Sequence, residues 1–343
     1  MSTVVQAPTP PEVEIRSGFL DQARARARDF WIGGVLIVLI LLFGLISPNF
    51  LTRPSWLNTS NTAVEVLLLA VGETFVICTG GIDLSVGAIL GFSGMAGGWV
   101  MQTYFPNAVG AAPGVLAVGF IATIAGGGIF GLVNGVLIAK MDIPPFVVTL
   151  GTLGIATGLG DLLNNGQEIS NIPTSVAKIG NFNIFNWIPM PVFIAALLTI
   201  VAAIILHRTR FGAHTLAIGD SREAVIRAGI NDRRHLIKVY VLSGVLAGVA
   251  AVLVISRIGA ASPLSGSTDN LSAIAAVVIG GTSLFGGRGS IVGSVIGTAI
   301  IAVLLTGLIV INVPPFWQMV AVGAVLILAV YIDQLRNRKK ARA

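Results

Sequence analysis

Charged residues are scarce in this chain of 343 residues: they make up 10% of it, against 55% hydrophobic residues and a mean hydropathy of +0.90. A soluble domain carries about 25% charged residues. The composition therefore excludes a soluble globular protein, and the length suits many membrane spans. Cysteine is also nearly absent, because Cys78 is the one residue of its kind. A single cysteine excludes a disulfide framework or a multi-cysteine metal site within one chain.

Motifs for ATP hydrolysis and for other catalysis are missing as well. None of the five lysines lies in a Gly-x-x-x-x-Gly-Lys-Ser/Thr phosphate loop, and the chain has no zinc motif or catalytic triad. We therefore expect a protein that is not an enzyme, and that either depends on another molecule for its energy source or has none. A cleavable signal peptide is not expected either, because the first apolar run starts near Trp31 and is followed by "SPNFLTRPSW".

Long apolar runs dominate what is present. A membrane-spanning helix needs about 20 mostly apolar residues, and this criterion predicts an all-α polytopic protein with about ten spans. The eighth is short and ends in "GGTSLFGGRGS", which predicts a broken or re-entrant segment. The predicted spans lie near 31–48, 62–80, 84–102, 114–139, 144–163, 189–206, 239–256, 271–286, 290–310 and 316–333.

The distribution of Lys and Arg predicts the orientation of these spans. With the N-terminus inside and ten crossings, 18 of the 21 basic residues fall on the cytoplasmic side and three fall outside. This asymmetry is what the positive-inside rule expects. Both termini are therefore predicted to be cytoplasmic. The net charge of +6 needs no nucleic-acid partner to explain it.

The same pattern divides the chain into regions. We expect a cytoplasmic tail at 1–30, a transmembrane permease domain at 31–333 that contains a cytoplasmic loop at 207–238, and a basic cytoplasmic tail at 334–343. Within the first tail, "TVVQAPTPPEVE" is Pro-rich, and "SGFLDQARARARDF" is predicted as an amphipathic helix on the inner membrane surface. The polar segment 164–188 is predicted as an exposed outer connection.

The loop 207–238 contains a short predicted helix. Asp220 and Ser221 precede Glu223 in the pattern of a helix start, and Gly229 supplies a stop. The helix would have about eight residues, with a small apolar face made by Ala224, Val225 and Ala228. Two interpretations stay open: a surface helix resting on the bilayer, or a knob that docks into a cytoplasmic partner. The three histidines, His207, His214 and His235, lie in this loop, where we expect them to be solvated or beside lipid headgroups.

Several segments resemble one transporter family. "EAVIRAG" (223–229) is similar to the Glu-Ala-Ala-x-x-x-Gly loop of ABC importer permeases, with Val225 in place of the second Ala. "TGGIDLSVG" (79–87), "GLVNGVLIAKMDIPPFVVTLGT" (131–152) and "IAAVVIGGTSLFGGRGSIVGSVIG" (274–297) resemble the ribose/xylose/galactose branch. The chain is thus identified as similar to the monosaccharide permeases of ABC importers, and among these most like a ribose permease.

The resemblance implies a larger machine in the bacterial inner membrane. Two permease copies would form the pore and import sugar by alternating access. A cytoplasmic ATP-binding protein, often with two ATPase domains in one polypeptide, would hold ATP and Mg²⁺, so that no cofactor is expected in this chain. A periplasmic sugar-binding protein would deliver the substrate. The residues expected to couple to the ATPase are Asp220, Ser221, Glu223, Ala224, Arg227 and Gly229.

Acidic residues within the spans leave two interpretations open. Glu65, Glu73 and Asp83 lie at membrane depth, where charges usually face a bundle interior or water. They could be relays of an ion-coupled transporter that works alone. Alternatively, Asp83 is the N-cap of the third span at the inner interface, with Gly80 and Gly81 ending the helix before it. "GGIDLSVG" (80–87) and "GGTSLFGG" (280–287) form a faint repeat.

Candidates for the sugar path are few. A neutral sugar needs hydrogen-bonding groups, but small polar residues in spans more often join helices to one another. Pentoses, hexoses, inositols and related polyols all stay possible substrates. The candidate path residues are Glu73, Asp83, Asn134, Thr149 and Thr152, and, in the outer connection, Asn164 and Asn165.

Overall fold

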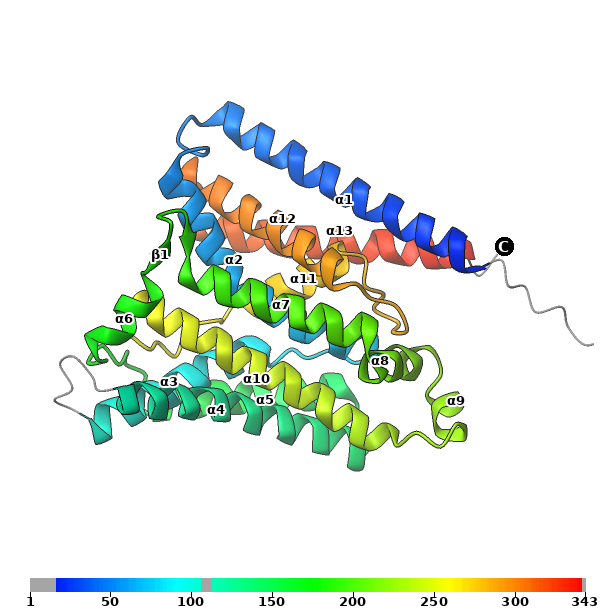
Figure 1. The fold of residues 1–343 in the computed structure, drawn as a ribbon, viewed down its shortest axis with the longest axis horizontal. Coiled ribbons are helices and arrows are strands. Elements are labelled where there is room, and N and C mark those ends of the chain that lie inside the picture. The colour runs from blue at the N-terminus through cyan, green and yellow to red at the C-terminus, as the bar shows by residue number, and fades with distance from the viewer. Residues whose placement is uncertain (1–16, 106–112, 341–343) are drawn as a thin grey trace, which may run out of the picture.

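The computed structural model describes residues 17–105 and 113–340, and these residues form a bundle of helices with one small hairpin (Figure 1). The helices are α1 (Ser17–Ile46), α2 (Arg53–Cys78), α3 (Val86–Tyr104), α4 (Pro113–Lys140), α5 (Pro145–Leu162), α6 (Thr174–Gly180), α7 (Met190–Arg208), α8 (Arg210–Asp220), α9 (Arg222–Arg227), α10 (Asp232–Ile258), α11 (Asp269–Ile279), α12 (Ile291–Val310) and α13 (Pro315–Lys340). The strands β1 (Asn183–Ile184) and β2 (Ile188–Pro189) pair antiparallel.

Each of the ten predicted spans coincides with one of the helices α1–α5, α7 and α10–α13. Within the described residues, seven helices are both long and apolar enough to cross a membrane: α2, α4, α5, α7, α10, α12 and α13. Ile32–Ile46 of α1 and all of α11 are shorter apolar helices. The eighth predicted span is confirmed as broken, because α11 has 11 residues and the chain from 280 to 290 is not helical. The chain is therefore a helical multi-pass membrane protein.

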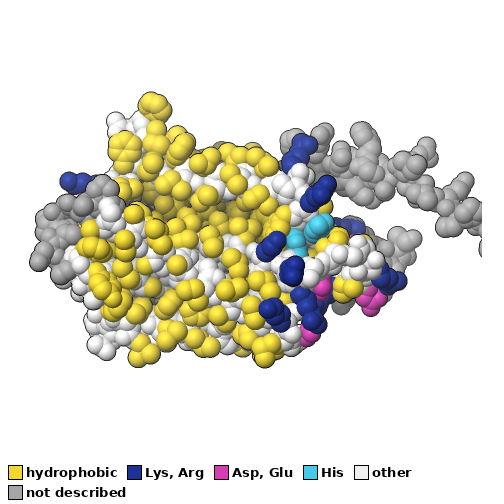
Figure 2. All heavy atoms as spheres, turned by 60° about the horizontal axis from the view of Figure 1, so that its bottom comes forward, with side chains coloured by type: hydrophobic (Ala, Val, Ile, Leu, Met, Phe, Trp, Pro, Cys, Tyr) yellow, Lys and Arg dark blue, Asp and Glu magenta, His cyan; other side chains and the backbone are white. Residues whose placement is uncertain are grey.

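The helices α2 and α10 lie at the centre of the bundle. Of the most apolar stretch of each, 72% and 78% of the residues are buried, against 6% in α13. The long helices run side by side along one axis (Figure 1), and apolar side chains cover most of the face of the body that Figure 2 shows. A helix that is apolar on all sides but little buried within the protein is stable where its exposed surface contacts lipid.

Glycines bring α4 against α10. A Cβ added to Gly131 would lie 2.3 Å from the carbonyl oxygen of Tyr240, and one added to Gly127 would lie 2.2 Å from that of Gly244. These α4 glycines are four residues apart and share one helix face. Small residues let membrane helices approach to backbone contact and so gain packing that larger side chains would prevent.

Two ends of the bundle differ in what they carry. The first described turn of α1, the end of α13, and α8 and α9 lie at one end, which we call the α9 end (Figure 1). The segments α6 and β1 lie at the other, which we call the α6 end. Lys and Arg side chains gather at the α9 end of the apolar body (Figure 2).

Some predicted segments differ from the structure. Residues 17–30 are not a separate surface helix, because α1 continues without a break from Ser17 to Ile46. Residues 1–16 of the predicted tail lie outside the described residues. The basic segment from 334 begins as a direct continuation of α13, which ends at Lys340. The outer connection 164–188 contains α6 and β1, which its Asn, Gly and Pro content did not predict.

Candidate functional site

The helix α9 begins within the predicted start Asp220–Glu223 and ends before Gly229, but it is shorter than predicted. The Ser221 hydroxyl accepts a hydrogen bond from the Ala224 N–H at 3.3 Å, so Ser221 is the N-cap. The helix has six residues rather than eight, and Gly229 follows it with φ +77°, a left-handed conformation that favours glycine. Asp220 is the last residue of α8, one position before the cap.

One apolar side chain and one arginine anchor α9 to the bundle. Val225 is 3% exposed and packs in a cluster with Ala139, Ile218 and Leu236. Arg222 Nε donates to Asp232 Oδ2 at 2.7 Å, which joins α9 to the start of α10. The anchor therefore ties α9 to α4, α8 and α10 at the α9 end.

The other side chains of α9 face outward. Glu223 and Arg227 pair with each other at 3.0 Å, and both are more than three-quarters exposed. Ala224 and Ala228 are exposed too, so the predicted apolar face is divided: Val225 points inward, and the two alanines point away from the bundle. The result is a short protruding helix whose outer face is free within the described structure (Figure 1).

Behind α9, three backbone segments meet closely. A Cβ added to Gly219 of α8 would lie 2.0 Å from the Cys78 carbonyl oxygen and 2.4 Å from the Gly287 nitrogen. Gly287 N–H also donates to the Cys78 carbonyl at 3.0 Å. We call this contact of Gly219, Cys78 and Gly287 the glycine junction. It places the end of α8 directly against the end of α2 and the connection between α11 and α12.

The two Gly-rich repeats occupy matching helix ends. Gly80 and Gly281 both have φ +82° and donate three residues back, to Ile77 and Val278. The next residue in each case, Gly81 or Thr282, donates five residues back, which is the Schellman arrangement. The prediction that the Gly pair ends the second span is confirmed. The matching positions are offset by one residue from the sequence repeat.

Next to the first of these turns lies a buried polar cluster formed by Glu73, Asp83, Ser85 and Asn134, each 0% exposed. Glu73 Oε1 accepts from the Asp83 N–H at 3.0 Å, and Asp83 Oδ1 accepts from the N–H of Ser85 at 2.9 Å and from its hydroxyl. Asn134 Nδ2 donates to Ser85 Oγ at 2.9 Å. The cluster joins α2, the turn before α3, and α4.

Asp83 is therefore not an N-cap at the interface, and that prediction is wrong. The N-cap of α3 is Ser85, and Asp83 lies two residues earlier in the packed interior. It accepts the Ser85 N–H from outside the helix, as aspartate commonly does in turns. The dipole argument was right that Asp83 acts as an acceptor near this helix start, but it placed the N-cap two residues too early.

The remaining path candidates lie apart from the cluster to different degrees. Thr149 Oγ1 donates to the Ile82 carbonyl at 3.3 Å, which ties α5 to the same turn. Among the described residues, Thr152 Oγ1 donates only within its own helix, to the carbonyl oxygens of Val148 and Thr149. Asn164 and Asn165 lie in the turn after α5, where Asn164 donates to the Gln167 carbonyl and Asn165 has φ +51°. The three candidates Glu73, Asp83 and Asn134 come together, and the turn residues do not join them.

Sequence reasoning missed Tyr240 and misplaced His235. Tyr240 is 0% exposed, and its hydroxyl lies against Gly81 with no hydrogen-bond partner among the described residues. A tyrosine within the apolar run 239–256 was the available signal. His235 was expected to be solvated, yet it is 6% exposed, 2.8 Å from Thr215 Oγ1, with its ring against Phe211.

Glu65, the third acid, forms an ion pair near the α6 end. Arg257 Nη2 donates to Glu65 Oε1 at 3.1 Å and joins α2 to the last turn of α10. Both side chains are mostly buried, with Glu65 15% exposed and Arg257 24% exposed. A partner of opposite charge is a structural reason for this acid at membrane depth, and it sets Glu65 apart from Glu73 and Asp83.

Comparison with known proteins identifies relatives over most of the chain. Residues 55–330 match the family model described as branched-chain amino acid transport system / permease component. The ribose import permease protein RbsC of Bacillus subtilis (strain 168) is 37% identical over 304 residues, which cover 88% of this chain and 91% of that protein.

Two further relatives have comparable coverage. The ribose import permease protein RbsC of Escherichia coli (strain K12) is 36% identical over 313 residues, with 89% and 92% of the two chains covered. The fructose import permease protein FrcC of Rhizobium meliloti is 37% identical over 309 residues, with 88% and 83% covered. No solved structure matches this chain. The chain belongs to the family of ABC import permease components that includes these relatives.

Proposed function

We propose that this chain is the membrane-spanning subunit of an ATP-driven importer of a monosaccharide or related polyol. Two copies form the translocation path, a cytoplasmic ATP-binding protein with two ATPase domains drives it, and a periplasmic sugar-binding protein delivers the substrate. All ten predicted spans cross a bacterial inner membrane, with both termini and α9 inside. ATP and Mg²⁺ bind to the partner, and none of this chemistry occurs in this chain.

The observation that carries the proposal is the capped, anchored and outward-facing helix α9 at the basic end of the bundle. A helix that only rested on a bilayer would turn its apolar face to the lipid. Here Val225 is buried in the protein, and the exposed side chains are a mixture of charged and apolar ones: Glu223, Ala224, Ile226, Arg227 and Ala228. This favours the docking knob over the surface helix.

The glycine junction supplies a route from α9 into the membrane. Motion of α9 is passed to α8 through the intervening Ser221, and the end of α8 presses on the end of α2 at Cys78. Five residues before Cys78, α2 carries Glu73, which holds the turn before α3. We therefore propose that closure of the ATPase moves α2 and α3 relative to each other. The movement is transmitted by the backbone contacts of the glycine junction, which are too close to be compressed.

The predicted path residues fit this movement. In the conformation described here, Glu73, Asp83, Asn134, Thr149 and Thr152 are sealed inside one chain, at 0–2% exposed. We propose that they meet the sugar only in a state in which α3 has separated from α2 and α4. The hydrogen bonds that join Glu73, Asp83 and Asn134 through Ser85 then close the path in the present state.

We place the second copy against α5. Gly151, Gly154 and Gly158 share one face of this helix, and nothing lies within 4 Å of the position that a Cβ would take on any of them. An open small-residue face allows close approach of a second helix. Single cysteines at these positions, in a Cys78→Ala background, are expected to cross-link between copies, and a cysteine at Leu328, an exposed residue of α13, is the matched control.

The proposed function is tested by reconstitution with the ATPase and binding protein in proteoliposomes. We expect sugar uptake to require all components, and Glu223→Ala and Gly229→Val to leave ATP hydrolysis while abolishing uptake. Among the described residues, Glu223 pairs with exposed Arg227 alone, so its loss should hardly affect folding. Lys178→Ala, at the other end of the bundle, is the control. Uptake by the chain alone, or normal uptake by both α9 variants, would reject the proposal.

A further inference from the structure

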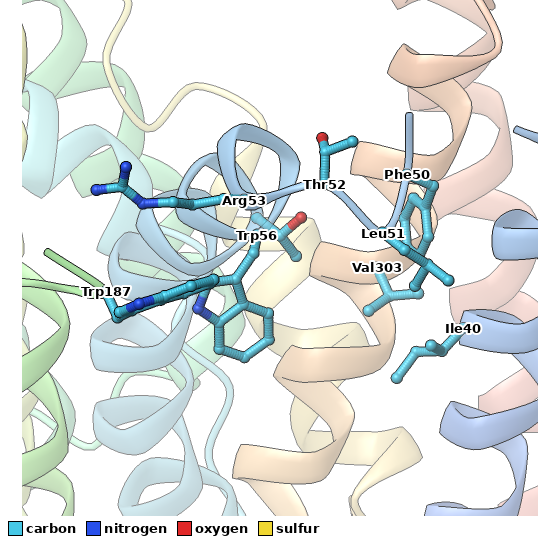
Figure 3. A pocket seen from close by; sticks show the side chains of 9 residues that line it. Ile40, Phe50, Leu51, Thr52, Arg53, Trp56, Trp187 and Val303 are labelled. Atoms are coloured by element: carbon cyan, nitrogen blue, oxygen red, sulfur yellow. The ribbon is translucent and has the colours of Figure 1, made fainter. Parts of the chain in front are cut away.

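An amphipathic cavity of about 270 Å³ lies under the turn between α1 and α2, at the α6 end of the bundle (Figure 3). It is separate from α9 and from the buried polar cluster. The side chains around it come from α1, the α1–α2 turn, α2, α12 and the hairpin: Ile40, Phe50, Leu51, Thr52, Arg53, Trp56, Thr59, Trp187 and Val303.

Its two sides differ in chemistry. On one side, Arg53 lies over the ring of Trp187, with its guanidinium carbon 5.7 Å from the ring centre, and Trp56 lies beside them (Figure 3). On the other side, Phe50, Ile40 and Val303 present only hydrocarbon. A site with a cation and indoles at one side and only hydrocarbon groups at the other matches an amphipathic ligand.

The polar side is also the shallower one with respect to the membrane. Arg53 is the first residue of α2, and Trp187 belongs to the hairpin turn. Ile40 lies six residues before the end of α1, about 9 Å deeper, and Val303 lies seven before the end of α12, about 10 Å deeper. Tryptophan and arginine typically gather at headgroup level, with apolar side chains toward the hydrocarbon.

Arg53 retains donors for a ligand. Its Nε and Nη2 donate to the Asn186 carbonyl oxygen, with Nε at 3.0 Å, which fixes the guanidinium in place. A guanidinium has five N–H donors in a planar fork that suits phosphate. The hydrogens not used on Asn186 have no other hydrogen-bond partner among the described residues, and the side chain is exposed.

We propose that this cavity binds one glycerophospholipid of the surrounding bilayer, with its phosphate on Arg53, its glycerol region against Trp56 and Trp187, and part of an acyl chain between α1 and α12. A neutral sugar would need several hydrogen-bonding groups, and the lining offers few besides Arg53, Thr52 and Thr59. The lipid would hold α1 against the bundle. In this part of the fold, α1 packs through the apolar cluster that its Phe43 forms with Phe50 and Val303. The proposal requires only that the bundle lies in a membrane.

Native mass spectrometry of the purified full chain with added lipids tests the site. We expect dioleoyl phosphatidylglycerol to bind about tenfold more tightly than dioleoylglycerol, which has the same chains and no phosphate. Arg53→Gln should remove that preference. Leu51→Glu, which places a carboxylate on an exposed lining position, should weaken phosphatidylglycerol binding without disturbing the interior. Lys178→Gln removes an exposed cation outside the cavity at the same end, and should leave binding unchanged.

Equal binding of the two lipids to the unaltered chain, or an unchanged preference in both Arg53→Gln and Leu51→Glu, would overturn the proposal. Displacement of the bound lipid by added ribose would also overturn it, because the cavity would then be a sugar site. Loss of binding in Lys178→Gln as well would show a general charge effect rather than this cavity, and would count against it.

Discussion

Asp83 shows how a carboxylate is accommodated in the middle of an apolar bundle. It accepts the N–H and the hydroxyl of Ser85, and its own N–H binds Glu73. One oxygen of each carboxyl, Asp83 Oδ2 and Glu73 Oε2, has no hydrogen-bond partner among the described residues. Buried polar groups are retained when the bonds they make outweigh desolvation. The cluster therefore stabilises the turn before α3 and keeps unused acceptors in the interior.

Replacing Asp83 should reveal how much these bonds contribute. We expect Asp83→Ala to lower the free energy of unfolding by about 2–3 kcal/mol, because the Ser85 N–H and hydroxyl lose their acceptor in a dry interior. Asp83→Asn should cost less, since its amide oxygen can still accept from Ser85. Unfolding by SDS in mixed micelles measures the difference, with Glu168→Ala, an exposed acid of the outer connection, as the control. Equal stability of Asp83→Ala and the unaltered chain would contradict this role.

At the residue scale, helix caps and turns could be predicted from the sequence, whereas side-chain contacts between different helices could not. The Ser221 cap, the Gly229 stop and the turn at Gly80 follow from backbone requirements that neighbouring residues impose. Ser85 and Tyr240 could not be found in this way, because their roles depend on Glu73, Asn134 and Gly81 meeting across helices. The burial of His235 has the same origin, since it follows from Thr215 and Phe211 on a different helix.

At the scale of elements, the α4–α10 contact depends on glycine at fixed positions. We expect Gly131→Ala to destabilise the bundle by about 1–3 kcal/mol, since the new Cβ meets backbone atoms of Tyr240 and Val241 that cannot move aside alone. Gly128→Ala on the same helix is the matched control, because its Cβ would meet only a Val245 methyl at 3.3 Å. Similar unfolding free energies for the two variants in mixed micelles would show that α4 and α10 can move apart at this contact at little cost.

The glycine junction makes a second prediction at this scale. Gly219→Ala places a methyl group against the Cys78 carbonyl and the Gly287 nitrogen, so the end of α8 must shift away from α2. We expect normal membrane insertion and ATPase binding, but uptake per ATP hydrolysed at least about tenfold lower, because the movement of α9 no longer reaches α2.

The control for this variant lies on the same helix. Ala213→Ser alters an exposed position of α8 away from the junction and should leave coupling unchanged. The measurement is the ratio of sugar uptake to ATP hydrolysis in proteoliposomes. A Gly219→Ala permease with an unaltered ratio would show that coupling follows another route.

The positions of the helices were predictable at this scale, and their pairings were not. Hydropathy located ten helical segments because lipid demands long apolar runs. It could not show that Gly127 and Gly131 contact α10 whereas Gly151 and Gly154 face outward, since all four lie in similar apolar and glycine-rich sequence. It also missed the continuity of α1 through residues 17–30, because the change from polar to apolar sequence indicates a change of environment and not a break in the helix.

For the molecule as a whole, the two ends carry different charge and different structure. Basic residues gather with α8 and α9 at one end, while α6, the hairpin and the Arg53–Trp187 contact lie at the other. Positive charge stays on the cytoplasmic side during insertion. In the proposed importer, the α9 end therefore faces the cytoplasm and the partner ATPase, and the α6 end faces the partner sugar-binding protein.

Cysteine labelling tests this orientation. Cys78 is buried, so Cys78→Ala gives a background in which one new cysteine can be followed. In intact spheroplasts, we expect a membrane-impermeant maleimide to label Lys178→Cys on α6. Glu223→Cys on α9 and Lys340→Cys at the end of α13 should react only after permeabilisation. Labelling of Glu223→Cys from outside would place α9 beyond the reach of any cytoplasmic ATPase, whereas reaction of Lys340→Cys alone would mean that α13 does not complete its crossing.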